Sequence, residues 1–174
     1  MLMPRVLLPV GCCREESNND QVASEFGTVV TAAGSANTKG SYSTLIASTA
    51  YDAYGIMIEF YNTAVASTAT SQLTDIALGA ASSERVVIPN LFSGNAGTSI
   101  GAQNAGNAFF FPLFIPAGSR ISARMQSLIA SDTVNVKVTL FQWPINGVPT
   151  IERVTAYGVD TGDSGGVAHT PGSG

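Results

Sequence analysis

The sequence predicts an all-β protein, and three features of the chain favour that class. Short segments with an apolar side chain at every second position recur along it, which is the period of a strand with one buried face. Stretches of Gly, Ser, Thr, Asn and Ala separate these segments. No window combines helical apolar spacing with a capping residue. We therefore expect short strands packed into a sandwich.

The first half of the chain contains five predicted strands. The alternation is clearest over Tyr54–Asn62, where Ile56, Ile58 and Phe60 share one face. The other four strands are predicted over Glu25–Thr31, Ser41–Ser48, Leu73–Leu78 and Glu84–Ile88. Pro89 is expected to end the last of them, because proline has no N–H for a sheet hydrogen bond.

The segment Ala108–Gln142 is predicted to form three strands with two short connections. Ile121, Ala123 and Met125 alternate with polar residues, and four apolar residues from Val134 onward do the same. We expect these three strands to form a meander. The preceding stretch, from Leu91 to Ala108, is rich in Gly, Asn and Ala and is expected to be a crossover loop available for contacts.

An Asn146-Gly147 turn predicts a hairpin near the end of the domain. It would pair Thr150–Tyr157, as a ninth strand, with Lys137–Trp143. The expected architecture is therefore a jelly-roll-like β-sandwich of about eight or nine strands with extended terminal arms. Residues 1–24 are assigned to an N-terminal arm, 25–158 to the sandwich domain and 159–174 to a Gly/Ser-rich C-terminal tail.

The composition favours assembly with other subunits. Only 11% of the 174 residues are charged, whereas about 25% is usual in soluble proteins. A surface built from small uncharged side chains loses little side-chain entropy and little ion solvation when a partner covers it. A homo-oligomer, with a trimer favoured, is our expectation, and a monomeric secreted β-domain is the alternative.

Charge and hydropathy exclude two classes of partner. The net charge of −4 argues against nucleic acid, which needs clustered basic residues to release phosphate counterions. No apolar run approaches the roughly 20 residues of a membrane helix. We therefore predict no nucleic acid and no membrane among the partners.

The N-terminal arm, the predicted polar strand face and the tail supply the candidate interface residues. Met1–Asp20 is apolar, and Pro4 and Pro9 favour an extended chain that docks on a neighbour. Arg120 and Arg124 share the polar face of one strand, where they would either bind a partner that carries carboxylates or be exposed to solvent. The predicted interface set is Leu2, Val6, Leu7, Leu8, Arg120, Arg124 and His169.

The sequence lacks the pattern of a catalytic or metal site. Thr161–Gly166 contains the Gly-Asp-Ser-Gly-Gly sequence that surrounds the nucleophile of chymotrypsin-like proteases. Those enzymes need a histidine before the serine, whereas His169, the only histidine, follows Ser164 by five residues. Cys12 and Cys13 are adjacent and are expected to be free thiols. We predict no enzymatic activity, no cofactor and no metal.

Parts of Ser41–Gln142 resemble small virion structural proteins of tailed bacteriophages. The resemblance is carried by Phe110–Arg124 and Ala130–Val136, preceded by Ile76–Ala81 and Val86–Leu91. It implies a jelly-roll head decoration (cement) protein, made in the host cytoplasm and located on the capsid surface of the virion, with the major capsid protein as its partner.

Two alternative functions remain open. One is a structural component of the phage tail, collar or fibre. The other is a carbohydrate-binding jelly-roll module, which would need an exposed Trp or Tyr platform; Trp143 is the only tryptophan.

Overall fold

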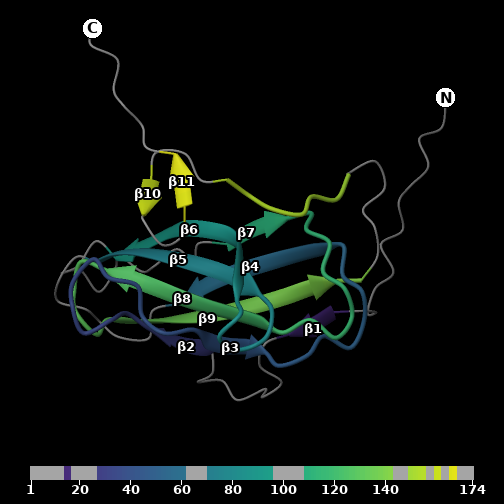
Figure 1. Cartoon of the computed structure of the whole chain (residues 1–174), viewed down its shortest axis with the longest axis horizontal. Coiled ribbons are helices and arrows are strands. Elements are labelled where there is room, and N and C mark those ends of the chain that lie inside the picture. The colour runs from purple at the N-terminus through teal and green to yellow at the C-terminus, as the bar shows by residue number, and fades with distance from the viewer. Residues whose placement is uncertain are drawn as a thin grey trace, which may run out of the picture.

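The computed structural model confirms the all-β class. It describes residues 14–16, 27–61, 70–95, 108–142, 149–155, 159–161 and 165–167. Within these ranges there are eleven strands and no helix. Nine of the strands form two antiparallel sheets that pack face to face as a sandwich (Figure 1).

Each main sheet contains four strands that lie side by side and are hydrogen-bonded to one another. The first sheet has the order β2-β9-β4-β7, and β1 pairs with β9 on the same side as β2. Its strands are β1 (Arg14–Glu16), β2 (Thr28–Thr31), β4 (Gly55–Tyr61), β7 (Ala108–Phe111) and β9 (Thr133–Phe141). The second sheet has the order β3-β8-β5-β6. Its strands are β3 (Ser43–Ile46), β5 (Thr70–Leu78), β6 (Arg85–Asn95) and β8 (Ile121–Ser127).

The pairing of the strands is nested, which defines the jelly roll. β5 pairs with β6, β4 with β7, β3 with β8 and β2 with β9, all antiparallel. The chain is thus one long hairpin of four strand pairs that is wound into a sandwich. Winding brings β9 beside β4 and β8 beside β5, which completes both sheets. The predicted jelly-roll architecture is therefore confirmed.

The meander expected over Ala108–Gln142 is wrong. β8 lies in the second sheet, whereas β7 and β9 lie in the first, and β7 pairs with β4 rather than with β8 or β9. Three strands that are consecutive in the chain therefore form no hydrogen-bonded pair with one another. The alternating pattern correctly identified the buried face of each strand, but it holds no information about which strand becomes the neighbour.

The hairpin expected between β9 and a ninth strand is also wrong. β9 already has β4 on one side and β1 with β2 on the other, so it offers no free edge. Ile151 instead forms a parallel bridge with Leu113, and Val154 N donates to Val87 O at 2.8 Å. The segment 149–155 therefore connects the edges of the two sheets. The Asn146-Gly147 turn lies outside the described residues.

β6 continues past Pro89, where the sequence predicted its end. Ile76 pairs with Ile88 and Thr74 pairs with Leu91, so Pro89 and Asn90 together face the single residue Asp75. This is a β-bulge, and Asn90 takes the positive φ of 55° within it. Proline is tolerated because β6 is an edge strand. The predicted loop is therefore wrong for residues 91–95, which belong to β6, and residues 96–107 lie outside the described residues.

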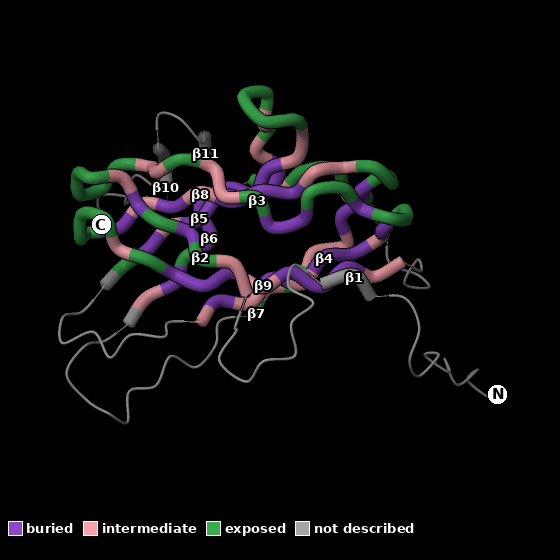
Figure 2. The backbone as a smooth tube through the Cα atoms, turned by 90° about the horizontal axis from the view of Figure 1, so that it is seen from below, coloured by how far each residue is buried: buried purple, intermediate pink, exposed green. Residues whose placement is uncertain are grey.

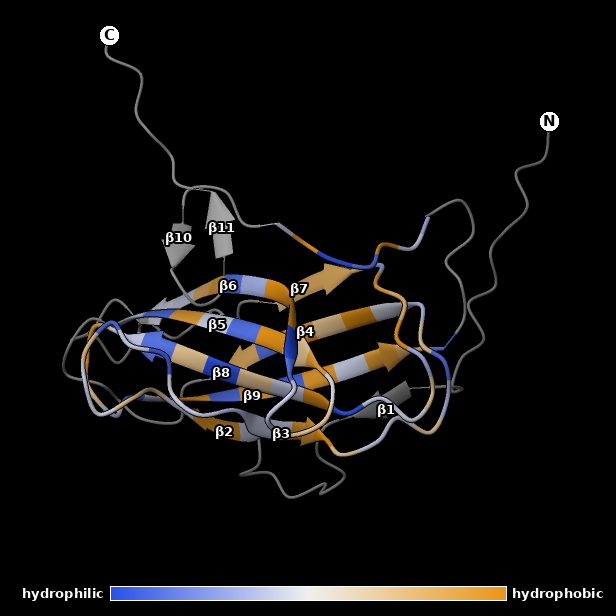
Figure 3. Ribbon diagram, viewed as in Figure 1, coloured by the Kyte–Doolittle hydropathy of each residue, from blue (hydrophilic) through white to orange (hydrophobic). Residues whose placement is uncertain are grey.

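The core lies between the two sheets. Ile56 and Ile58 of β4 and Val138 of β9 face Ile121 and Met125 of β8, and all five side chains are fully buried. Figure 2 shows the buried residues along the strands and the exposed ones mainly in the connections. The alternation of hydropathy along individual strands is visible in Figure 3. The two-residue period therefore places one face of each strand in a single shared core.

Two further elements lie near the ends of the described chain: one strand that joins the first sheet and one separate strand pair. β1 falls inside residues 1–24 and pairs Glu15 with Leu140 of β9. β10 (Val159–Thr161) and β11 (Gly165–Val167), inside residues 159–174, form a separate antiparallel pair.

Candidate interaction surfaces

Two of the seven predicted interface residues fall where the structure describes side chains. Arg124 lies in β8, on the outer face of the second sheet and opposite Asp75 of β5. Arg120 directly precedes β8, at the end of the same sheet. The other predicted interface residues, which lie outside the described ranges, are Leu2, Val6, Leu7, Leu8 and His169.

The outer face of the second sheet contains a buried carboxylate. Asp75 of β5 and the Lys39 side chain, from the β2–β3 connection, are 0% and 2% exposed. Lys39 Nζ lies 2.9 Å from Asp75 Oδ1, 3.0 Å from Asn90 Oδ1 and 3.1 Å from Leu73 O. The three ammonium donors thus each have an acceptor, which compensates for the loss of water.

Arg124 completes this group, which we call the Asp75 cluster: Lys39, Tyr42, Asp75, Asn90 and Arg124. Arg124 Nε donates to Asp75 Oδ2 at 3.1 Å, and its guanidinium lies 4.8 Å from the centre of the Tyr42 ring. Asn90 N, at the bulge of β6, donates to Asp75 Oδ1 at 2.9 Å. One carboxylate therefore joins the β2–β3 connection, β8 and the bulge.

Arg120 has its carboxylate partner within the same chain as well. Its Nη1 donates to Glu84 Oε1 at 2.9 Å, and its Nε and Nη2 donate to Thr44 Oγ1. The pKa of Glu84 is lowered, because the carboxylate accepts a hydrogen bond from its own backbone N–H and another from Arg120. The acidic groups that Arg120 and Arg124 contact are thus Glu84 and Asp75.

The outer face of the first sheet has a smaller polar group and, farther along the strands, an aromatic pair. Tyr61 Oη donates to Glu59 Oε1 at 2.8 Å, and Lys137 Nζ lies 3.9 Å from Glu59 Oε2. The rings of Phe110 and Phe141 meet edge to face, with centroids 5.4 Å apart. Burial raises the pKa of Tyr61 to about 12, and the hydrogen bond to the Glu59 carboxylate and its charge add to the rise.

We expect the Tyr61 phenol to titrate near pH 12 in the folded protein, and Glu59→Gln to move the midpoint back toward 10. Because the folded pKa is the higher one, the contribution of Tyr61 to stability is complete below pH 10 and is lost as pH rises through 12. NMR of ring-labelled tyrosine, with Tyr61→Phe to assign the signal, measures the midpoint. An unchanged midpoint in Glu59→Gln would show that Glu59 does not contribute.

The phenylalanines of 109–114 have different environments. Phe109 and Phe111 are partly buried and pack against the core. Phe110 and Phe114 are 41% and 37% exposed. The alternation within the short edge strand β7 accounts for Phe110, whose side chain lies on the outer face next to Met57.

Little of the protease-like sequence lies in the described part of the chain. Thr161 and Gly165 face each other as paired residues of β10 and β11, whereas 162–164 and His169 lie outside it. The described residues contain no group of three or more His, Cys, Asp or Glu side chains placed to hold a metal ion. Among the same residues, no helix has the length and hydropathy to cross a membrane.

The positive and negative charges of residues 27–155, which we call the body, are equal in number, and most of them are paired. Residues 27–155 contain equal numbers of basic and acidic side chains, so the excess negative charge belongs to residues 1–26 and 156–174. The basic residues are Lys39, Arg85, Arg120, Arg124, Lys137 and Arg153, and the acidic ones are Asp52, Glu59, Asp75, Glu84, Asp132 and Glu152. Seven of these twelve take part in the ion pairs described above. The body therefore presents few unpaired charges to a partner.

Strand order and surface define this chain as a jelly-roll protein with a charge-poor exterior. No family model and no curated protein sequence matches it. Among solved structures it is similar to the VP2 subviral particle of infectious bursal disease virus, with a TM-score of 0.33 and 15% identity. The match covers 74% of this chain and 32% of the viral chain, so this chain spans about a third of that protein. The jelly-roll assignment itself rests on the nested strand order.

Proposed function

We propose that this protein is a structural subunit of a virus particle that decorates the assembled head by binding the lattice of the major capsid protein. The observation that carries the proposal is the paired charge of the jelly-roll body. Asp75 and Glu84 hold Lys39, Arg124 and Arg120 within the chain, which leaves mostly uncharged side chains on the outside. Jelly rolls also recur in viral capsids, and the sequence resembles small virion proteins of tailed phages.

The proposed action is thermodynamic and includes no catalytic step. A protein that binds the assembled lattice, and not its free subunits, stabilises the lattice by mass action. Few charges have to be desolvated when such a body is covered, which lowers the cost of binding. In this proposal the protein associates as a homo-trimer, and the N-terminal arm of residues 1–24 adds apolar contacts with a neighbour.

The copy number in purified particles tests the proposed function. We expect quantitative mass spectrometry to find a number of copies comparable with that of the major capsid protein, because a decoration protein occupies repeated lattice positions. Heads that lack the protein are expected to rupture at a lower temperature than complete heads. A small fixed number of copies would instead assign the protein to the tail, collar or a single vertex, and absence from particles would refute a structural role in them.

A further inference from the structure

The β3–β4 and β7–β8 connections form a rigid platform at one end of the sandwich. Thr49 N donates to Ser119 O at 2.8 Å, Gly118 N donates to Thr49 O at 2.7 Å, and Thr49 Oγ1 donates to Pro116 O at 2.8 Å. Ala53 and Ile115 exchange two backbone hydrogen bonds of 2.8 Å. These bonds fix the backbone on both sides of Tyr51, so the position of this residue is set by the fold.

Aromatic rings are exposed on this rigid backbone. Tyr51 is 62% exposed, the highest value among the large hydrophobic side chains that the structure describes, and Phe114 is 37% exposed. The Tyr54 and Phe114 rings lie with centroids 5.4 Å apart. An aromatic side chain has few rotatable bonds, so a ring on a fixed loop offers a contact surface that loses little entropy on binding.

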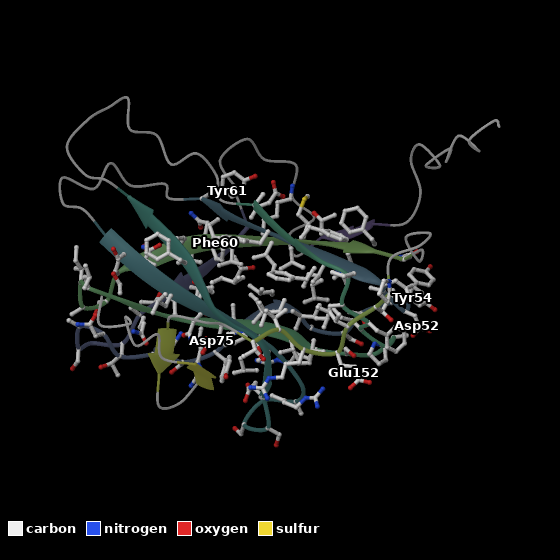
Figure 4. All side chains as sticks on the ribbon, turned by 90° about the horizontal axis from the view of Figure 1, so that it is seen from above. Asp52, Tyr54, Phe60, Tyr61, Asp75 and Glu152 are labelled. Carbon is white, nitrogen blue, oxygen red and sulfur yellow. The ribbon has the colours of Figure 1, made fainter. Side chains whose placement is uncertain are left out.

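Carboxylates accompany the rings at the same end of the molecule (Figure 4). Asp52 is exposed, and its Oδ1 accepts a hydrogen bond from Ala117 N at 2.8 Å, which orients the group. Glu152 is also exposed and follows Ile151, whose carbonyl accepts from Phe114 N at 3.1 Å. Ionised carboxylates only accept hydrogen bonds, so a ligand at this end must bring donors.

An open depression lies beside the same two connections. It measures about 680 Å³, a size that holds small ligands, and small residues of the β3–β4, β5–β6 and β7–β8 connections form most of its wall. Ser83, Arg85 and Ser119 supply polar groups to it. The platform and the depression together offer flat rings, acceptors and donors around one end of the sandwich.

We propose that this end binds a saccharide, with the Tyr51 ring stacked on one face of a pyranose. A pyranose has a face of C–H groups and a rim of hydroxyl groups, which matches an exposed ring with the Asp52 and Glu152 carboxylates at the same end of the sandwich. A neighbouring sugar unit occupies the depression at Arg85. Exposed Arg153 next to Glu152 lowers the local negative charge, which favours a neutral ligand over a basic peptide. This binding is independent of the proposed role in the particle.

Saturation-transfer NMR with the full chain tests the proposal. The probes are oligosaccharides of glucose, galactose, mannose, rhamnose and the two N-acetylated hexosamines, together with an Arg/Lys-rich peptide. We expect transfer to at least one oligosaccharide and about a tenfold loss of affinity in Tyr51→Ala, the size of one lost aromatic contact. Phe92→Ala is the matched control, because Phe92 is 56% exposed on the second sheet, and it should bind like the parent protein.

Three outcomes would overturn the saccharide site. They are no transfer to any oligosaccharide, binding of the basic peptide alone, or equal losses in Tyr51→Ala and Phe92→Ala. Thermal unfolding of both variants checks that they are folded, which is expected since both side chains are exposed. A second variant, Asp52→Asn, keeps an oxygen for Ala117 N and should weaken sugar binding without unfolding the loop.

Discussion

Asp75→Ala is expected to lower the free energy of unfolding by about 3–5 kcal/mol, the usual cost of removing one partner from a buried ion pair. The variant leaves the side chain of Lys39, 2% exposed, and that of Arg124, 15% exposed, without the carboxylate that they share. Asn90 N also loses its acceptor. Urea unfolding at a fixed protein concentration measures the change, and the fixed concentration excludes effects of self-association.

Two control variants separate a buried unpaired charge from a simple loss of contacts. Glu84→Ala removes the partner of Arg120, whose side chain is 17% exposed, and should cost less because water can solvate the guanidinium. Replacing Lys39, Asp75 and Arg124 together by apolar residues of similar size should restore most of the stability. A loss below about 1 kcal/mol in Asp75→Ala would show that water reaches the cluster.

Ile58→Ala is expected to cost about 2–5 kcal/mol, because it leaves a cavity in the centre of the core. Ile58 is 0% exposed and lies in β4 between Val138 of β9 and Phe109 of β7. Val29→Ala, at a position that is 55% exposed in β2, is the control and should change stability by no more than about 0.5 kcal/mol. Equal effects of the two substitutions would contradict the assignment of the β4 inner face to the core.

The sequence alone located the eight strands of the jelly roll, although not their full length, and the inner face of most of them. Ile56, Ile58 and Phe60 were predicted on one face, and all three are buried. Ile121, Ala123 and Met125 are buried in the same way in β8. This success has a local cause, because the two-residue period of an extended chain assigns each side chain to a face without reference to any other strand.

The partners of the charged residues were decided by the tertiary structure. The sequence placed Arg120 and Arg124 on a polar face, but their carboxylates, Glu84 and Asp75, lie 36 and 49 residues away in the chain. No spacing rule connects such positions. A signal was present at Pro89, since a proline inside an apolar run can mark a bulge at a sheet edge, and that bulge places Asn90 on Asp75.

The assignment of strands to sheets and the exposure of Tyr51 on the platform were also decided by the tertiary structure. The strand pattern determined that Ala108–Gln142 is β-structure, whereas the winding of the nested hairpin decided that β8 and β9 lie in opposite sheets. Tyr51 gave no signal in the sequence, because its exposure arises where the β3–β4 connection is bonded to residues 115–119. Local periodicity determines which side chains avoid water, while neighbours and surface sites depend on long-range contacts that form only when the whole chain closes.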